Sequence, residues 1–198
     1  MPLKPCLPEA ALAQLFTEAH THKAWLPDAV PLDTLRELHR LANLAPTSMN
    51  CQPLRIVFIT TAAAKERLIP ALMAGNVDKT RQAPVTAIVA YDSQFYEHFP
   101  HIFPGAGTRD MFANNAALAD INATRNGSMA GGYLILAARA LGLDCGPMSG
   151  FANAKVDAEF FPDGRWKSNF LCNLGVGDAS KSMPRNPRLS FEQACQVL

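Results

Sequence analysis

The stretch Ala45-Pro46-Thr47-Ser48-Met49-Asn50-Cys51-Gln52-Pro53, followed by residues 54–60, contains the signals from which the fold is read. Within it, Ile56-Val57-Phe58-Ile59 is a run of β-branched and aromatic residues, which predicts a buried strand. Pro46 and Pro53 fix φ and keep the residues before them extended, so the loop ahead of this strand is stiff. A stiff loop with neutral hydrogen-bonding side chains suits a polar ligand, although a plain connection between a helix and a strand has the same composition.

The composition is that of a folded globular protein. Of the 198 residues, 48% are hydrophobic and 18% are charged. This length suits one sizeable α/β or α+β domain, and the lack of a repeat or linker favours a single domain over residues 1–198. The net charge of +1 gives no general attraction to nucleic acid or anionic membranes, and no apolar run reaches the ~18 residues of a spanning helix.

The cysteines and the first residues indicate the compartment. The five cysteines are odd in number, widely spaced and without a C-x-x-C pair, which indicates reduced thiols and argues against zinc. Residues 1–6 lack the apolar core of a signal peptide. We therefore expect a cytoplasmic protein that binds no metal.

Outward from the opening stretch, apolar periodicity predicts a succession of helices and strands. Thr34 and Glu37 fit a capping box for a helix over 33–44, and Gly142 ends the longest predicted helix, over 116–143. Small residues in the middle of that long helix permit close approach of another helix, as at a dimer axis, or of a flat ligand. The remaining expected elements are helices over 8–19, 62–69 (capped by Thr61), 156–161 and 190–197, and strands over 85–91 and 169–177.

Three segments lack a clear pattern. Residues 93–115 are rich in aromatic side chains and are interpreted as a functional insertion or lid, or as cover for a neighbouring subunit. Residues 144–151 are expected to form a loop whose backbone amides a planar ligand can approach. Residues 175–178, Gly-Val-Gly-Asp, match only part of a dinucleotide fingerprint, because the third glycine and the following helix are missing.

A cluster of basic and hydroxyl side chains, His20-Thr21-His22-Lys23-Ala24-Trp25, follows the first predicted helix. Two histidines without a neighbouring cysteine or carboxylate do not indicate a metal site. Thr21 and Lys23 can both donate to phosphate oxygens, so the cluster is interpreted as an anion contact or as a solvated turn.

The sequence lacks the usual markers of hydrolysis and phosphoryl transfer: no nucleophile elbow, Walker loop or H-E-x-x-H motif occurs. Its scattered donors instead suit a phosphorylated aromatic cofactor that carries the chemistry itself. These donors are Thr21, Lys23, Ser48, Asn50, Asn76, Lys79, the backbone of residues 147–150, and Arg188.

The order of these pieces resembles the flavin-dependent nitroreductase family. Within that family the chain is most similar to the RutE-type malonic semialdehyde reductases. The similarity spans nearly the whole chain, is weakest over 102–122, and is carried by Thr21-His22 and by residues 46–53, 76–90, 92–97, 142–151 and 188–192.

This resemblance implies an α+β fold, in which helices flank a central, mostly antiparallel sheet, and an intertwined homodimer with two FMN sites at its interface. It implies a role at the FMN for four groups of residues. These are His20, Thr21, Lys23 and Arg188 at the phosphate and ribityl chain; Pro46, Thr47, Ser48 and Asn50, reaching the flavin of the partner subunit; Asn76 and Lys79 at the polar edge of the ring; and the main chain of Pro147, Met148, Ser149 and Gly150 along the ring.

The chain departs from the family pattern at two positions. The family has an arginine near the first phosphate position, where this chain has Ala19 and His20, and the charge of a histidine depends on pH. Next to flavin N5 many relatives have a glutamate, where this chain has Ser149, as in the semialdehyde reductases. Removing a carboxylate from that edge favours an anionic substrate.

The resemblance therefore implies an enzyme that passes a hydride from NADH or NADPH through FMN to a small acceptor. The implied acceptor is malonic semialdehyde, reduced to 3-hydroxypropanoate in pyrimidine breakdown, and no side chain is expected to be catalytic. Two alternatives remain: a broad nitro or quinone reductase on the same scaffold, and a flavin-binding dimer without turnover.

Overall fold

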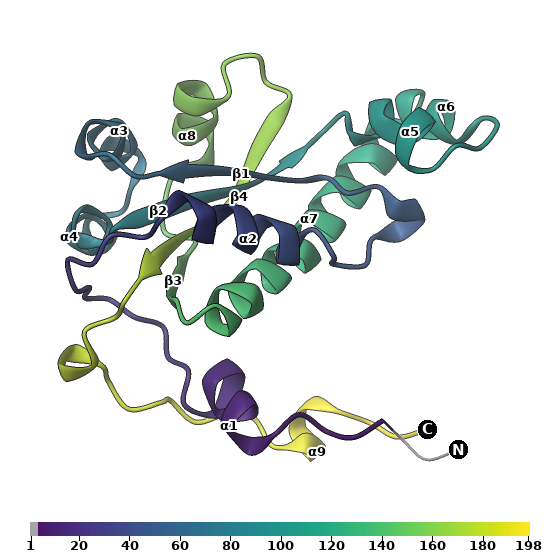
Figure 1. Ribbon diagram of the computed structural model, residues 1–198. Helices are drawn as coiled ribbons and strands as arrows, with labels where there is room; N and C mark the ends of the chain where they lie inside the picture. Colours follow the sequence, from purple (N-terminus) through teal and green to yellow (C-terminus); the bar gives the residue numbers. More distant parts are fainter. Residues whose placement is uncertain (1–3) are drawn as a thin grey trace.

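The computed structural model describes residues 4–198; Met1–Leu3, where the segment without a signal-peptide core begins, lie outside the described residues. One or more helices separate each strand from the next along the chain, and Figure 1 shows their arrangement. In chain order they are α1 (Glu9–Leu12), η1 (Ala13–Thr17), α2 (Leu32–Ala42), η2 (Ser48–Asn50), β1 (Leu54–Ile59), α3 (Ala62–Leu68), η3 (Ile69–Ala71), α4 (Ala74–Gln82), β2 (Val85–Asp92), η4 (Phe95–His98), α5 (Phe99–Ile102), α6 (Thr108–Ala113), α7 (Ala116–Ala140), β3 (Asp144–Met148), α8 (Asn153–Phe160), β4 (Trp166–Gly175), η5 (Ala179–Lys181) and α9 (Phe191–Ala194).

The four strands form one sheet in the order β1-β2-β4-β3, and each neighbouring pair is antiparallel. The central strand β2 pairs Ile88 with Val57 of β1 and with Leu171 of β4. Its residues 85–90 are fully buried, as its β-branched composition predicts. The predicted α+β fold with a mostly antiparallel sheet is confirmed.

Alternation along β2 divides the core between the two faces of the sheet. Val85 and Val89 point to one face, where they pack with Leu38 of α2 and Leu134 of α7. Ile88 belongs to the other face, whose core includes side chains from α3 and α8. Figure 1 shows α2 and α7 on one side of the sheet and α3 and α8 on the other. The sheet is thus covered on both faces.

Residues 93–115, here called the aromatic lobe, are helical and have a small core of their own. Phe112 lies edge-on to Phe95, with ring centroids 5.0 Å apart, and to Phe99, at 5.7 Å. Cys51 and the first turns of α7 close this core. Because these three phenylalanines are buried within the chain, the interpretation that they cover a neighbouring subunit is wrong for them.

Other predicted elements are confirmed with shifted ends, and two need correction. Helix α2 begins at Leu32 after Pro31, so Thr34 lies inside the first turn and caps nothing; the predicted capping box is wrong. The predicted loop over 144–151 is wrong over Asp144–Met148, which is edge strand β3, paired with β4. Pro147 is tolerated there because an edge strand leaves one side of its backbone unpaired. The sequence-based elements also omit helix α4, over Ala74–Gln82.

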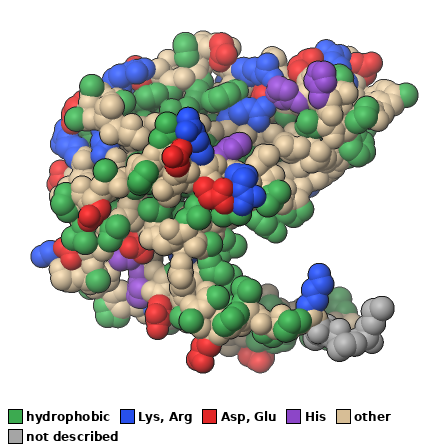
Figure 2. Space-filling view, in the orientation of Figure 1, with side chains coloured by type: hydrophobic (Ala, Val, Ile, Leu, Met, Phe, Trp, Pro, Cys, Tyr) green, Lys and Arg blue, Asp and Glu red, His purple; other side chains and the backbone are tan. Residues whose placement is uncertain are grey.

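The two ends of the chain pack together as a terminal arm, defined here as residues 4–19 and 183–198. The Arg185 guanidinium donates to the backbone carbonyls of Phe16, at 2.8 Å, and Ala19, at 2.6 Å. Figures 1 and 2 show this arm projecting from the body, with an open notch between them. Large apolar side chains of the arm are exposed, among them Phe16, Leu189 and Phe191. Among the described residues, no helix is long and apolar enough to cross a membrane.

Candidate functional site

A basic pocket with a volume of about 270 Å³ opens where the terminal arm meets the body. It brings together four residues predicted to hold a phosphate: His20, Thr21, Lys23 and Arg188. Sequence reasoning missed three more cations in its lining, Arg139, Lys181 and Arg185. They come from the end of α7, from η5 and from the C-terminal segment, and no local motif links them. Asp178 also lines the pocket, but its single negative charge is outnumbered by the lysines and arginines, so the net charge of the lining is strongly positive.

The wall that carries Thr21 and Lys23 is fixed to the edge of the sheet. Thr21 forms a parallel bridge with Cys145 of β3, and the His22 amide donates to the Cys145 carbonyl at 3.0 Å. The His22 imidazole Nε2 lies 3.3 Å from Asp144 Oδ1, and its ring covers Gly177 so closely that a Cβ there would overlap it. Gly177, part of the incomplete dinucleotide fingerprint, is therefore explained by packing against a histidine ring.

The two arginines of the C-terminal segment have different partners. Arg185 is occupied by the carbonyls of the terminal arm. Arg188 donates to carbonyls of its own turn, Asn186 at 2.8 Å and Pro187 at 3.3 Å, and its side chain is exposed. A turn-bound, exposed guanidinium can exchange these bonds for an anion at small cost, whereas Arg185 would have to release the arm.

A second predicted group lies next to this pocket, between α4 and the end of β3. The Asn76 amide donates to the Gly150 carbonyl at 2.7 Å. Lys79, one turn further along α4, is partly buried, and burial lowers the pKa of its ammonium group. The positive charge of Lys23 lowers the pKa of Lys79 further, so the two cations lie near each other. An anionic or electron-rich group between them would relieve this repulsion.

The end of β3 also borders an open groove of about 410 Å³. Pro147, Met148 and Ser149 form one side, and Ser128 and Gly132 of α7 contribute to the other. A Cβ on Gly132 would meet nothing within 4 Å, so the helix surface there is flat and open. Residues 147–149 of the predicted segment 147–150 therefore border a groove that is open to a planar ligand.

The third predicted group, on the loop formed by residues 46–53, lies elsewhere. The Ser48 amide donates to Asn126 Oδ1 of α7 at 2.8 Å, and the Asn50 amide group donates to the Ile102 carbonyl of the aromatic lobe at 2.9 Å. Figure 1 shows this loop at the opposite end of the sheet from α4. One chain thus does not bring Pro46, Thr47, Ser48 and Asn50 to the basic pocket.

The donor set fits a phosphate attached to a planar ring system. The pocket offers cations and the Thr21 hydroxyl for the phosphate, and the adjoining α4 and β3 residues offer amide, ammonium and backbone groups for a polar ring edge. The buried Nε of Arg139, in the pocket lining, has no hydrogen-bond partner in the described part of the chain. No group of three or more potential metal ligands occurs among the described residues.

Comparisons with known proteins identify a family and relatives of high sequence identity. The model of the nitroreductase family matches residues 17–176. A predicted NADH dehydrogenase/NAD(P)H nitroreductase of Ralstonia nicotianae is 55% identical over 98% of this chain and 100% of its own length. One of Rhodopseudomonas palustris with the same description is 54% identical over 97% of this chain and 98% of its own.

Solved structures have the same fold at low sequence identity. A predicted nitroreductase of Exiguobacterium sibiricum, crystallised in complex with FMN, superposes with a TM-score of 0.83 at 18% identity, over 94% of this chain and 97% of its own. A nitroreductase family protein of Streptococcus pneumoniae superposes with a TM-score of 0.82 at 19% identity, over 94% of this chain and 100% of its own.

Proposed function

This chain belongs to the nitroreductase family, and we propose that it is an FMN-dependent oxidoreductase that takes its reducing equivalents from NADH or NADPH. The observation that carries the proposal is the basic pocket beside the open backbone at the end of β3. NAD(P)H stands in the names of the relatives that are more than half identical to this chain, and FMN in the description of a protein with the same fold.

Different groups of residues in this chain bind different parts of FMN. His20, Thr21, Lys23 and Arg188 bind the phosphate and the ribityl chain. Asn76 and Lys79 face the polar edge of the ring, and burial together with the positive charge of Lys23 lowers the pKa of Lys79. The main chain of residues 147–150 runs along the ring, with Ser149 beside N5. Bound FMN supplies the hydride acceptor and donor of the reaction.

The active form is a homodimer. Pro46, Thr47, Ser48 and Asn50 lie at the other end of the sheet from the basic pocket, so in the proposed site they contact the flavin of a second copy of the chain. Exposed apolar side chains on α7, Ile121 and Met129 among them, and on the terminal arm supply surface for such an interface. We also assign the protein to the cytoplasm, because its five widely spaced cysteines include no C-x-x-C pair and suit reduced thiols.

The acceptor that we propose is malonic semialdehyde, which is reduced to 3-hydroxypropanoate in pyrimidine breakdown. Two features of the chain support it. First, Ser149 leaves the edge next to flavin N5 without a carboxylate. Second, the nearby cations Lys23 and Lys79 favour the binding of an anionic substrate. Hydrogen-bond donors that face the acceptor would stabilise the developing alkoxide, which would take its proton from water, so no side chain would have to transfer a proton at an essential step.

A broad nitro or quinone reductase is the second candidate. The names of the relatives support it, since they specify NADH dehydrogenase/NAD(P)H nitroreductase and no aldehyde. An open groove of about 410 Å³ at the end of β3 is also wide enough to admit several acceptors. The two candidates share the cofactor and differ in the acceptor alone.

The purified full-length protein tests the shared part of the proposal. We expect it to be yellow, to contain one FMN per chain, and to lose its visible flavin absorbance anaerobically on addition of NADH or NADPH. A yellow protein that neither nucleotide bleaches would instead be a flavin-binding dimer without turnover. A colourless protein that takes up no added FMN would contradict the cofactor assignment.

A further inference from the structure

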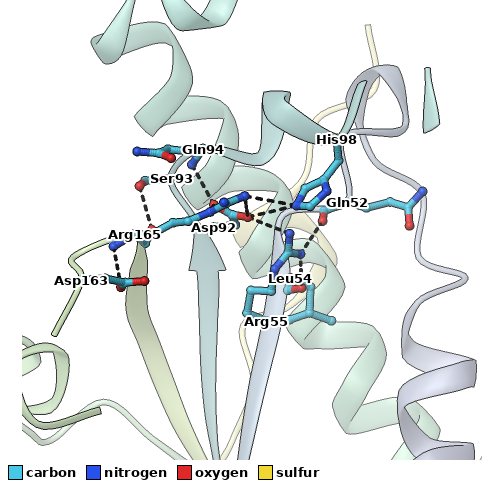
Figure 3. Close-up of polar contacts among 9 residues, drawn as sticks. All are labelled: Gln52, Leu54, Arg55, Asp92, Ser93, Gln94, His98, Asp163 and Arg165. Atoms are coloured by element: carbon cyan, nitrogen blue, oxygen red, sulfur yellow. Dashed lines mark hydrogen bonds and ion pairs between the residues drawn. The ribbon is translucent and has the colours of Figure 1, made fainter. Parts of the chain in front are cut away.

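A fully buried carboxylate, Asp92, ends strand β2 and joins four parts of the chain (Figure 3). Its oxygens accept from Arg55 Nη2 at 2.7 Å and from Arg165 Nε and Nη2 at 2.9 and 2.8 Å. His98 Nε2, from the aromatic lobe, lies 3.4 Å from Oδ2, and the Gln94 amide donates to Oδ1 at 2.8 Å. Asp92 begins the 92–97 segment that carries part of the family resemblance, and the proposed chemistry gives this segment no role.

Arg55 connects this carboxylate to the loop formed by residues 46–53. While Nη2 binds Asp92, Nη1 donates to the carbonyls of Gln52, at 3.0 Å, and Leu54, at 2.8 Å. The Asp92 amide also donates to the Pro53 carbonyl at 2.8 Å. Figure 3 shows the Arg55 guanidinium between Asp92 and the Gln52 backbone. The end of the loop is therefore fixed to the end of the sheet by a planar fork that only an arginine offers.

The loop that Arg55 holds has an unfavourable backbone. Met49, Asn50 and Gln52 have φ values of 51°, 51° and 39°, in the left-handed region that residues other than glycine rarely occupy. Such conformations persist only where neighbouring contacts impose them. Here the Gln52 amide donates to Thr47 Oγ1 at 3.2 Å, and the Gln52 side chain donates to Asn50 Oδ1 at 2.9 Å. Gln52 therefore helps to set the turn, together with the bonds from Ser48 to Asn126 and from Asn50 to Ile102.

We propose that Arg55, oriented by Asp92, is a positioning residue of the flavin site. Arg55 binds the Gln52 carbonyl and so keeps the left-handed turn in place. The position of this turn determines where Thr47 and Ser48 lie at the flavin site. The inference rests on the proposed function, in which this turn contacts the flavin of the partner subunit. Arg55 itself touches no part of that site, and it acts through Gln52.

Arg165 provides a matched control. It binds the same carboxylate with two nitrogens, and its Nη2 lies 3.2 Å from His98 Nε2. None of its hydrogen bonds among the described residues goes to the 46–53 loop. Arg55→Lys and Arg165→Lys therefore each weaken the binding of Asp92, but Arg55→Lys alone breaks the bridge to Gln52, because one ammonium cannot serve Asp92 and two carbonyls in the same fork geometry.

The experiment compares wild-type, Arg55→Lys and Arg165→Lys full-length proteins. Each is stripped of FMN and titrated with FMN by fluorescence quenching, and the visible circular dichroism of the flavin is recorded at saturation. We expect Arg55→Lys to raise the Kd for FMN about tenfold and to change the flavin dichroism, while Arg165→Lys keeps the Kd within about twofold of wild type. Hydrogen exchange at residues 47–52 of the FMN-free protein should accelerate in Arg55→Lys alone, which gives a readout independent of FMN.

Equal effects of the two variants on Kd, dichroism and exchange would overturn the inference, since Asp92 would then merely stabilise the fold. Unchanged values in a folded Arg55→Lys protein would overturn it as well. Failure of the proposed function is distinguishable from failure of this inference, because the wild-type protein itself would then bind no FMN. That result would also contradict the role of Arg55 at a flavin site.

Discussion

The side-chain amide of Asn76 donates a 2.7 Å hydrogen bond to the backbone carbonyl of Gly150, which joins helix α4 to the turn after β3. The backbone of the same turn accepts a second bond, from the Met73 amide at 3.0 Å. This contact is close because position 150 has no side chain. A Cβ there would lie 2.6 Å from Asn76 Nδ2 and 3.2 Å from Met73 Sδ.

Gly150→Ala should therefore displace the Asn76 side chain and break its bond. We expect a loss of about 1 kcal/mol in the free energy of unfolding, because a neutral hydrogen bond contributes about that much. FMN affinity should also fall, since Asn76 and the 147–150 backbone both face the proposed ring. Urea unfolding of the FMN-free protein and an FMN titration measure the two effects.

Gly75→Ala is the matched control for Gly150→Ala, at the position of α4 directly before Asn76. A Cβ at Gly75 meets nothing within 4 Å, so alanine fits without displacement. Alanine favours a helix over glycine by about 1 kcal/mol, and the variant should be more stable than wild type. Destabilisation by both substitutions would contradict the steric explanation for Gly150.

Arg188→Gln and Arg185→Gln should separate phosphate binding from the anchoring of the terminal arm. Arg188 donates only to carbonyls of its own turn in the described structure, so its loss should leave the melting temperature of FMN-free protein unchanged. Arg188→Gln should weaken FMN binding about tenfold at low salt and make that binding less sensitive to ionic strength.

Arg185→Gln should lower the melting temperature of the FMN-free protein, because it removes charged donors from Phe16 and Ala19. These bonds are exposed, so the expected loss is only about 1 kcal/mol. Differential scanning fluorimetry with and without FMN gives both readouts. A salt-independent loss of FMN affinity in Arg188→Gln would argue against a phosphate contact.

Asp92 predicts a specific pH dependence of stability. Burial raises the pKa of its carboxyl group, but hydrogen bonds from Arg165 and the Gln94 amide and the charge of Arg55 outweigh burial, and the net pKa lies below its usual value of 3.8. The ionised group thus stabilises the fold above that value, and this contribution is lost as the pH falls through the lower folded-state pKa. Asp92→Asn should cost about 3 kcal/mol near pH 7, because it removes one partner of a buried ion pair.

The difference between wild type and Asp92→Asn should shrink as the pH falls below about 4. Urea unfolding at a series of pH values measures it. A difference that grows toward acid pH would contradict the lowered pKa of this carboxylate.

Ser149→Glu tests whether the edge beside N5 selects for anionic acceptors. A carboxylate there should repel malonic semialdehyde and lower its kcat/KM by about tenfold, while a neutral nitroarene should lose little. Ser149→Gln has similar size without the charge and separates repulsion from crowding. If Ser149→Glu lowered kcat/KM equally for the charged and the neutral acceptor, Ser149 would no longer support malonic semialdehyde as the acceptor.

The strongest hydrophobic signals could be predicted from sequence, because they depend on local pattern. Strand β2 and helix α7 were predicted within a few residues, since Val85-Thr86-Ala87-Ile88 and the long apolar periodicity each admit one interpretation. Strand β3 was missed because Gly146 and Pro147 are poor strand residues in isolation. Pairing with β4 decides its conformation, and pairing is a property of the sheet.

Helix α4 was missed for a related reason. Gly75, Asn76 and Asp78 disfavour a helix locally, and contacts from distant residues compensate. Buried Lys65, whose pKa is lowered by burial, donates to the carbonyls of Arg81 and Ala83 at the end of α4. Such contacts join positions far apart in the sequence, and a single sequence does not reveal them.

The candidate site was predicted in part. His20, Thr21, Lys23 and Arg188 do share one pocket. Three further cations of that pocket were missed, because tertiary folding alone brings them there: Arg139, Lys181 and Arg185. The residues of the 46–53 loop remain a prediction for the partner subunit's flavin. The single domain over residues 1–198 also remains a prediction.

The acceptor is the central claim, and anaerobic stopped-flow reoxidation tests it most directly. The protein is first reduced with one equivalent of NADH or NADPH, and the return of flavin absorbance is followed with malonic semialdehyde, a quinone and a nitroarene in parallel. We predict that the semialdehyde restores the absorbance fastest and saturably. Comparably slow reoxidation by all three acceptors would contradict the assignment.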